Sequence, residues 1–114
     1  MIDLTPATLF TSRLRSRILT THQARLLIAL GVNAFWTDDD GLRLMATVHP
    51  NRLREDAALG WLSFARTLAD LKAAGIVTQV ARFKSGTVSY GVDIRGLPRR
   101  CELPALGDEQ EEAA

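Results

Sequence analysis

Residues 65–77 read Ala-Arg-Thr-Leu-Ala-Asp-Leu-Lys-Ala-Ala-Gly-Ile-Val, and they decide the fold that the sequence predicts. Phe64, Leu68 and Leu71 are spaced by four and three residues, which is the spacing of one buried helix face. Gly75 ends this helix, because glycine readily takes the left-handed conformation that follows a last helical turn. The other face of the predicted helix is polar and carries Ser63, Arg66, Thr67 and Asp70.

The residues after this helix predict a β-hairpin. Residues 76–83 are rich in β-forming side chains, and Lys84-Ser85-Gly86 has the composition of a tight turn. In residues 87–94 apolar and polar side chains alternate, as they do in a strand with one buried face. The apolar positions of that strand are Val88, Tyr90, Val92 and Ile94. The predicted hairpin therefore has a basic tip, flanked by Arg82 and Lys84.

Two helices are predicted near the start of the chain. Thr5 and Pro6 open the first one, as an N-cap and a first helical residue. The second begins near Thr20, where Thr20 and Gln23 have the spacing of a capping box. This second helix is expected to end near Gly31 or to run on to residue 35, with an apolar face that carries Ala24, Leu27, Ile28, Gly31 and Phe35.

A strand and a third helix are predicted in the middle of the chain. Residues 38–41, Asp-Asp-Asp-Gly, form a turn, and residues 42–48 alternate like a strand. Residues 34–37 are a possible first arm of a hairpin with that strand. Asn51 is the expected N-cap of the third helix, Gly60 its end, and Ser63 the N-cap of the helix that follows.

The resulting order is helix, helix, strand, helix, helix, strand, strand. Together with the Ala-Gly-Ile-Val exit at residues 74–77, this order resembles the winged helix-turn-helix superfamily over roughly residues 20–95. The resemblance implies an α+β fold in which residues 20–98 form the winged-helix domain with a three-stranded sheet. Residues 1–19 would add an N-terminal helix, and residues 99–114 an acidic, disordered tail. One core is expected to gather Leu27, Ile28, Leu68, Leu71, Val88, Tyr90 and Val92.

The charges divide unevenly along the 114 residues. Residues 101–114 hold five Asp and Glu and no Lys or Arg, whereas residues 1–100 hold all fourteen basic residues and eight acidic ones. A basic body favours an acidic partner, nucleic acid first, although ordinary surface charge gives the same pattern. No stretch is apolar enough to span a membrane, and the N-terminus lacks a basic signal region. A single cysteine, Cys101, is most simply explained by a reducing cytoplasm.

The resemblance implies contacts with double-stranded DNA. The helix from Ser63 would enter the major groove, where Arg66 can form a forked pair with a guanine and Thr67 allows close approach. The wing would contact phosphates through Arg82, Lys84, Ser85 and Thr87, and Arg52 and Arg54 could do the same. The alternatives are surface ion pairs: Arg66 with Asp70, and Arg52 and Arg54 with Asp56 and Glu55.

The N-terminal helix has two interpretations. Leu9, Phe10, Leu14 and Ile18 recur at helical spacing, and added helices often join winged-helix domains into dimers. We therefore expect a homodimer across this stripe, with packing of the stripe on its own domain as the alternative.

Other chemistry has little support in the sequence. The three aspartates at residues 38–40 do not have the alternating spacing of a calcium loop, and neither His22 nor His49 has a partner at metal-ligand spacing. We therefore expect no metal, no cofactor and no enzyme activity. The favoured function is a small bacterial, phage or plasmid transcriptional regulator. The alternatives are a protein-interaction subunit of a larger assembly, and a plasmid or phage replication or partition protein.

Overall fold

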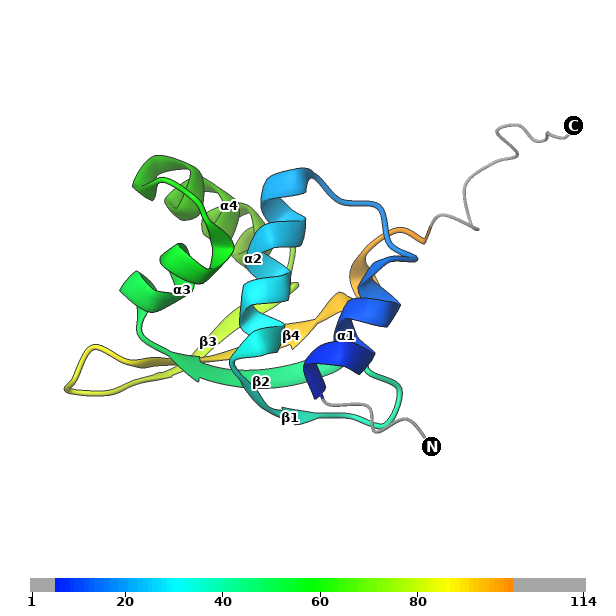
Figure 1. The fold of residues 1–114 in the computed structure, drawn as a ribbon, viewed down its shortest axis with the longest axis horizontal. Helices are drawn as coiled ribbons and strands as arrows, with labels where there is room; N and C mark the ends of the chain where they lie inside the picture. The colour runs from blue at the N-terminus through cyan, green and yellow to red at the C-terminus, as the bar shows by residue number, and fades with distance from the viewer. Residues whose placement is uncertain (1–5, 100–114) are drawn as a thin grey trace, which may run out of the picture.

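The computed structural model describes residues 6–99, and in these residues helices cover one face of an antiparallel sheet (Figure 1). The helices are α1 (Pro6–Leu14), α2 (Thr21–Val32), α3 (Pro50–Ala57) and α4 (Trp61–Ala73), followed late in the chain by a short 3-10 turn, η1 (Ile94–Gly96). The strands are β1 (Ala34–Thr37), β2 (Arg43–Val48), β3 (Val77–Arg82) and β4 (Val88–Asp93). The α+β class is therefore confirmed.

The sheet has four strands in the order β1-β2-β4-β3, so the expectation of three strands is wrong. Residues 34–37 form the additional edge strand, which pairs with β2 across the turn at residues 38–41. β4 lies between β2 and β3 and pairs antiparallel with both. The predicted hairpin of β3 and β4 is confirmed, and its turn projects from one end of the molecule beside α3 and α4 (Figure 1).

The core lies between the helices and the sheet. Alternate residues of β2 and β4 point into it, and the opposed pairs Leu44 with Val92, Ala46 with Tyr90 and Val48 with Val88 are all buried. Five of the seven predicted core residues are buried: Leu27, Leu71, Val88, Tyr90 and Val92. Leu68 is only partly buried. The expectation that Ile28 lies in the core is wrong, because Ile28 is 39% exposed. The buried face of α2 instead centres on Leu26, Leu27 and Leu30.

The first helix packs on its own domain. Phe10 and Leu14 are buried in the same core as the sheet residues, and the ring of Phe10 lies against Gly31 of α2. A Cβ at Gly31 would lie 3.0 Å from Cδ2 of Phe10, so glycine allows the close approach of α1 and α2. Phe10 and Leu14 are thus not available to a dimer interface, while Leu9 and Ile18 are half-buried. The homodimer itself stays a prediction.

Local hydrogen bonds fix where the helices begin and end. The capping box at Thr20 is confirmed, since its Oγ1 accepts from the Gln23 amide at 3.1 Å and Gln23 accepts from the Thr20 amide at 2.9 Å. The expected caps of α3 and α4 are wrong. His49, not Asn51, caps α3, and Gly60, not Ser63, occupies the N-cap of α4. α3 ends at the left-handed Ala58 rather than at Gly60.

Three expectations fall on residues that the structure does not describe. They are the cap at Thr5, the state of Cys101 and the disorder expected of the acidic tail from residue 100 onward. Arg99, the first residue of the predicted tail, is described and forms an isolated antiparallel bridge with Arg17.

Candidate nucleic-acid interface

Helix α4 buries one face and exposes the other. Phe64, Thr67 and Leu71 are buried, whereas Arg66 is exposed together with Leu62, Ala65 and Ala69. The expectation that Thr67 lies on the outer face is therefore wrong: it is 6% exposed and lies toward the start of α2. The outer face of α4 carries mostly small or apolar side chains. Arg66 is the only Lys or Arg of α4 ahead of Lys72, which lies in the last turn.

Arg66 lines a hollow of about 330 Å³ between α4 and the N-terminal turn of α2. The other residues around the hollow are Thr20, His22, Gln23, Ser63, Thr67 and Asp70. No ion pair joins Arg66 to Asp70 in the described part of the chain, so the alternative of a surface pair for Arg66 is not formed. The guanidinium thus stands beside the positive end of the α2 dipole with no carboxylate bound to it.

The wing turn is held against His49. Its backbone closes through two hydrogen bonds, from the Phe83 amide to the Thr87 carbonyl at 2.8 Å and from the Gly86 amide to the Phe83 carbonyl at 2.9 Å. Gly86 has a φ of +92°, and a Cβ there would lie 2.8 Å from Nε2 of His49. Glycine is required at this position for both reasons. Nδ1 of the same histidine accepts from the Asn51 amide at 3.1 Å, so His49 joins the wing to the start of α3.

The side chains predicted to contact DNA from the wing differ in whether they already have a partner within the molecule. Arg82 and Lys84 are exposed, and neither forms an ion pair within residues 6–99. Ser85 donates from its Oγ to Oγ1 of Thr87 at 3.0 Å, which stiffens the tip while leaving Ser85 exposed. The two cations are therefore available to an external anion, and the two hydroxyls mainly hold the turn.

The arginines of α3 are already engaged. Nε of Arg52 lies 3.1 Å from Oδ1 of Asp56, and Nη2 of Arg54 lies 3.9 Å from Oε2 of Glu55, so the alternative of surface pairs is confirmed for both arginines. Hydrogen bonds from Asn33 first, and then from Arg52, hold the pKa of Asp56 below its ordinary value. Arg54 donates to the Leu59 carbonyl at 3.0 Å and lies over the Trp61 ring, 4.6 Å from its centroid. Both arginines thus have local roles.

A groove of about 360 Å³ runs between α4 and β3, and the sequence reading missed it. Its floor is aromatic, with Trp61 and Phe64 meeting edge to face at 6.0 Å between ring centroids. Lys72 and Arg82 stand along it, and the Lys72 ammonium lies 3.5 Å from Oε1 of Gln79. The signal in the sequence was the spacing of Phe64, Leu68 and Lys72 by four residues, which places them on one side of α4.

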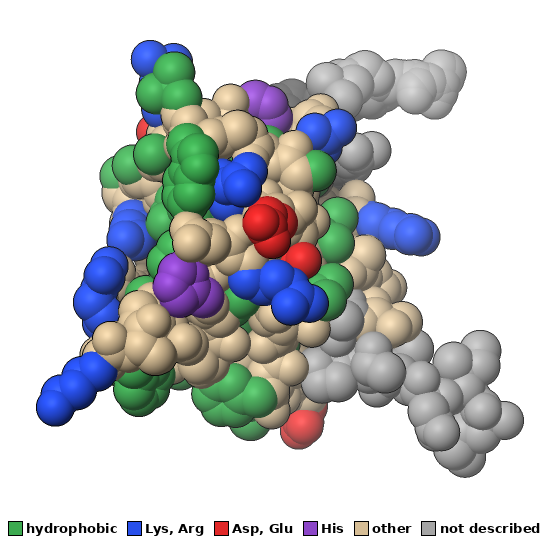
Figure 2. Space-filling model, turned by 60° about the vertical axis from the view of Figure 1, so that its left-hand side comes forward, with side chains coloured by type: hydrophobic (Ala, Val, Ile, Leu, Met, Phe, Trp, Pro, Cys, Tyr) green, Lys and Arg blue, Asp and Glu red, His purple; other side chains and the backbone are tan. Residues whose placement is uncertain are grey.

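Positive charge dominates the described chain. Residues 6–99 contain thirteen Lys and Arg and seven Asp and Glu. Figure 2 shows the end of the molecule that bears the wing: Lys and Arg side chains recur along the left edge of that view, with hydrophobic side chains among them. Such a mixture suits a surface that meets phosphates and sugars as well as base edges.

The described residues contain no helix long and apolar enough to cross a membrane. Within residues 6–99, no three His, Cys, Asp or Glu side chains are grouped so as to hold a metal ion. Neither a protein-family model nor a curated protein nor a solved structure matches this chain.

Proposed function

We propose that the chain is a winged-helix protein that binds double-stranded DNA and acts as a small transcriptional regulator. The observation that carries the proposal is the set of three unpaired cations, Arg66 on α4 and Arg82 and Lys84 on the wing. All three are exposed and form no ion pair within the described residues. The α4 helix and the wing stand at the same end of the molecule (Figure 1).

The topology supports this proposal. From α2 onward the chain runs helix, strand, helix, helix, strand, strand once the edge strand β1 is set aside, and β2, β4 and β3 are neighbours in that order. The order of elements along the chain is the one on which the sequence resemblance to the winged helix-turn-helix superfamily rests, and the edge strand β1 departs from the three-stranded sheet expected from it. In that arrangement α4 is the recognition helix and the β3–β4 hairpin is the wing.

The contacts on DNA follow from the exposed side chains. Ala65 and Ala69 let the backbone of α4 approach the floor of the major groove, and the Arg66 guanidinium forks onto N7 and O6 of a guanine. Lys84 and Arg82 contact phosphates beside the groove, which adds affinity without sequence preference. With one cation on the outer face of α4, base recognition is narrow, and much of the affinity is electrostatic.

One substitution and a control test whether Arg66 recognises a base. In the preferred duplex, Arg66→Ala is expected to cost about 1–3 kcal/mol and to relax the preference at one base pair. Arg95→Ala is the matched control, because Arg95 is exposed near the end of β4 that lies away from the wing. Fluorescence anisotropy with specific and random duplexes measures both. Equal losses from the two substitutions on every sequence would contradict base recognition by Arg66.

A protein-interaction subunit is the second candidate, and the apolar surface of α4 favours it. Leu62 is 64% exposed and Trp61 is 55% exposed beside the groove along β3. Exposed large apolar side chains of this kind mark interfaces. The substitution Leu62→Ser separates the two candidates. If α4 contacts DNA through Arg66, duplex affinity should stay within about twofold, because Leu62 offers no hydrogen bond to DNA. Replication or partition of a plasmid or phage would use the same DNA contacts.

A further inference from the structure

The groove between α4 and β3 lies along a free edge of the sheet. β3 is an outer strand in the order β1-β2-β4-β3, and within the described residues only its β4 side is paired. An outer strand exposes unpaired backbone N–H and C=O groups, which can pair with another extended chain. Gln79 and Arg82 of β3 also line the groove, so the free edge and the groove form one surface.

Hydrogen bonds at the two ends of β3 fix which backbone groups face the free edge. The Ile76 carbonyl accepts from the amide of the last residue of β4 at 2.9 Å. Because hydrogen-bonded and non-hydrogen-bonded pairs alternate in an antiparallel ladder, the N–H and C=O of Gln79 point away from β4. The same alternation, counted from the hydrogen bond between the Phe83 amide and the Thr87 carbonyl, applies to Arg82. Both residues therefore offer backbone hydrogen bonds to a further strand.

The floor of the groove holds a buried hydroxyl without a partner. Tyr90 of β4 is 2% exposed and lines the groove. Its hydroxyl forms no hydrogen bond within residues 6–99 and is not enclosed by protein atoms, so it opens on the groove. Burial raises the pKa of Tyr90, while the positive charge of Arg82 acts against that rise, so the guanidinium lies near the hydroxyl. An acceptor oxygen in the groove would satisfy both groups.

Two cations and an apolar wall complete the groove. Lys72 and Arg82 line it, and neither forms an ion pair within the described residues. Phe64 and Leu68 of α4, with the exposed Trp61, make the helix side apolar. Among the described residues no Asp or Glu lines the groove. Its surface therefore complements a ligand that combines a large apolar group with carboxylates.

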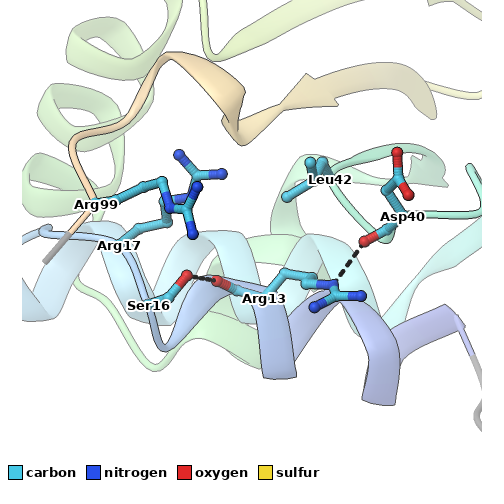
Figure 3. Close-up of a pocket in the computed structure, with 6 residues that line it drawn as sticks. All are labelled: Arg13, Ser16, Arg17, Asp40, Leu42 and Arg99. Atoms are coloured by element: carbon cyan, nitrogen blue, oxygen red, sulfur yellow. Dashed lines mark hydrogen bonds between the residues drawn. The ribbon is translucent and has the colours of Figure 1, made fainter. Parts of the chain in front are cut away.

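The arginines at the far end of the molecule are engaged, in contrast to that of the groove. Figure 3 shows the cavity at the end of α1, where Nε of Arg13 donates to a backbone carbonyl of the β1–β2 turn at 2.8 Å. Nη1 of Arg17, in the same cavity, donates to the Leu97 carbonyl at 2.9 Å. The side chains of Arg82 and Tyr90 form no such hydrogen bond within residues 6–99. A ligand therefore gains more polar contacts in the groove between α4 and β3.

We propose that this groove binds an extended acidic segment of another protein, which pairs with the free edge of β3 as a further strand. A large apolar side chain of the segment packs on Phe64 and Leu68. A carboxylate two residues away, on the same face of the added strand, accepts from the Tyr90 hydroxyl and pairs with Arg82. Backbone pairing supplies affinity, and alternate side chains supply specificity. The outer strands of a second copy do not fit, because β1 and β3 carry no Asp or Glu.

The test is a titration of the full chain with a fluorescein-labelled heptapeptide, Thr-Glu-Thr-Leu-Thr-Glu-Thr, followed by anisotropy at constant ionic strength. Saturable binding of one equivalent is expected. Replacing both glutamates of the peptide by glutamine, or its leucine by serine, should weaken binding by about tenfold or more. In NMR spectra the amides of Gln79 and Arg82 should gain protection from hydrogen exchange when peptide is bound, as strand pairing requires.

Substitutions locate the site. Tyr90→Phe should weaken peptide binding by about tenfold, the effect of one hydrogen bond to a charged group. It should not lower stability in urea unfolding, because the hydroxyl has no partner within residues 6–99. Lys72→Gln should also weaken binding. Arg25→Gln is the matched control, since it removes the same charge from an exposed position that does not line the groove.

Four results would overturn the inference. They are the absence of saturable binding, an equal loss in Arg25→Gln, and unchanged exchange of the Gln79 and Arg82 amides at saturating peptide. The fourth is binding that appears only after the acidic residues of 107–114 are replaced with Asn and Gln, which would mean that carboxylates of this chain occupy the groove. Peptide binding is measured without DNA, so this site and the proposed DNA interface can fail separately. Because Arg82 is common to both, peptide and duplex should compete.

Discussion

Leu71 is one of three buried residues of α4 and belongs to the core that the helices share with the sheet. It is 1% exposed, whereas Leu68, one turn earlier, is only partly buried. Leu71→Ala should therefore lower the free energy of unfolding by about 2–5 kcal/mol, because it removes buried methyl groups and leaves a cavity. Leu68→Ala should cost less than Leu71→Ala. Urea unfolding of both variants measures the difference, and a larger loss at Leu68 would contradict the orientation of α4.

Asp38 makes stability depend on pH. Burial raises its pKa, but hydrogen bonds from Arg43 and from the Leu42 amide outweigh burial and hold the pKa below the ordinary value of 3.8. Its Oδ1 accepts from the Leu42 and Arg43 amides at 2.9 and 3.0 Å, which closes the β1–β2 turn.

The lowered pKa of Asp38 determines the direction in which stability changes with pH. Its stabilising contribution is fully present above pH 3.8 and is lost as the pH falls through the lower folded value. Asp38→Asn should therefore lower stability at pH 7 by about 1–2 kcal/mol and flatten the acid limb of the stability curve. Thermal melts between pH 2 and pH 7 give both quantities. An unchanged acid limb in Asp38→Asn would show that other carboxylates control it.

Single residues also mark the limit of what the sequence could predict. The exposure of Arg66 was predictable from helical spacing. The spacing of Phe64, Thr67 and Leu71 also permits a buried Thr67, but its polar side chain favoured the outer face. The burial of Thr67 depends on the start of α2 lying over α4, a contact between segments more than forty residues apart. The role of His49 was hidden for a similar reason. Its Nε2 faces Gly86 of the wing turn, and only the folded chain brings the two together.

Among the elements, α1 belongs to the core of the domain. Phe10 is 0% exposed and lies against α2. Phe10→Ala should cost about 3–5 kcal/mol, as for other buried aromatic residues. Deletion of residues 1–18 should accordingly give an unstable chain. Circular dichroism and urea unfolding measure the stability of the truncated chain. A truncated chain as stable as the full one would show that α1 is dispensable.

Elements defined by local signals were predicted well. The capping box at Thr20 and the Lys84-Ser85-Gly86 turn involve residues within three positions of each other, so sequence alone carries them. The boundary between α3 and α4 was misplaced because both Asn51 and Ser63 are good caps in isolation. The side chain of His49, followed by Pro50, provides the cap of α3 instead, and Ala58 ends that helix in the left-handed conformation without glycine.

At the scale of the whole molecule, the uneven division of charge along the chain should affect the proposed DNA binding. Five acidic residues lie in residues 101–114, and residues 6–99 carry a surplus of six positive charges. Replacing the acidic residues of 107–114 with Asn and Gln should tighten binding to random duplexes at low salt, because fewer carboxylates compete with phosphate. The gain should shrink at high salt, where both interactions are screened. Equal affinity of the two chains at low salt would contradict such competition.

The most direct test of DNA binding at the α4 and wing surface is the salt dependence of duplex affinity, measured by anisotropy for the full chain and for Lys84→Ala. For the full chain, log K should fall linearly with log salt, by about 0.9 for each phosphate neutralised. Lys84→Ala should lower that slope by about one and weaken binding to all sequences alike. Absence of salt-dependent binding to any duplex, or a slope unchanged in Lys84→Ala, would contradict the proposed interface.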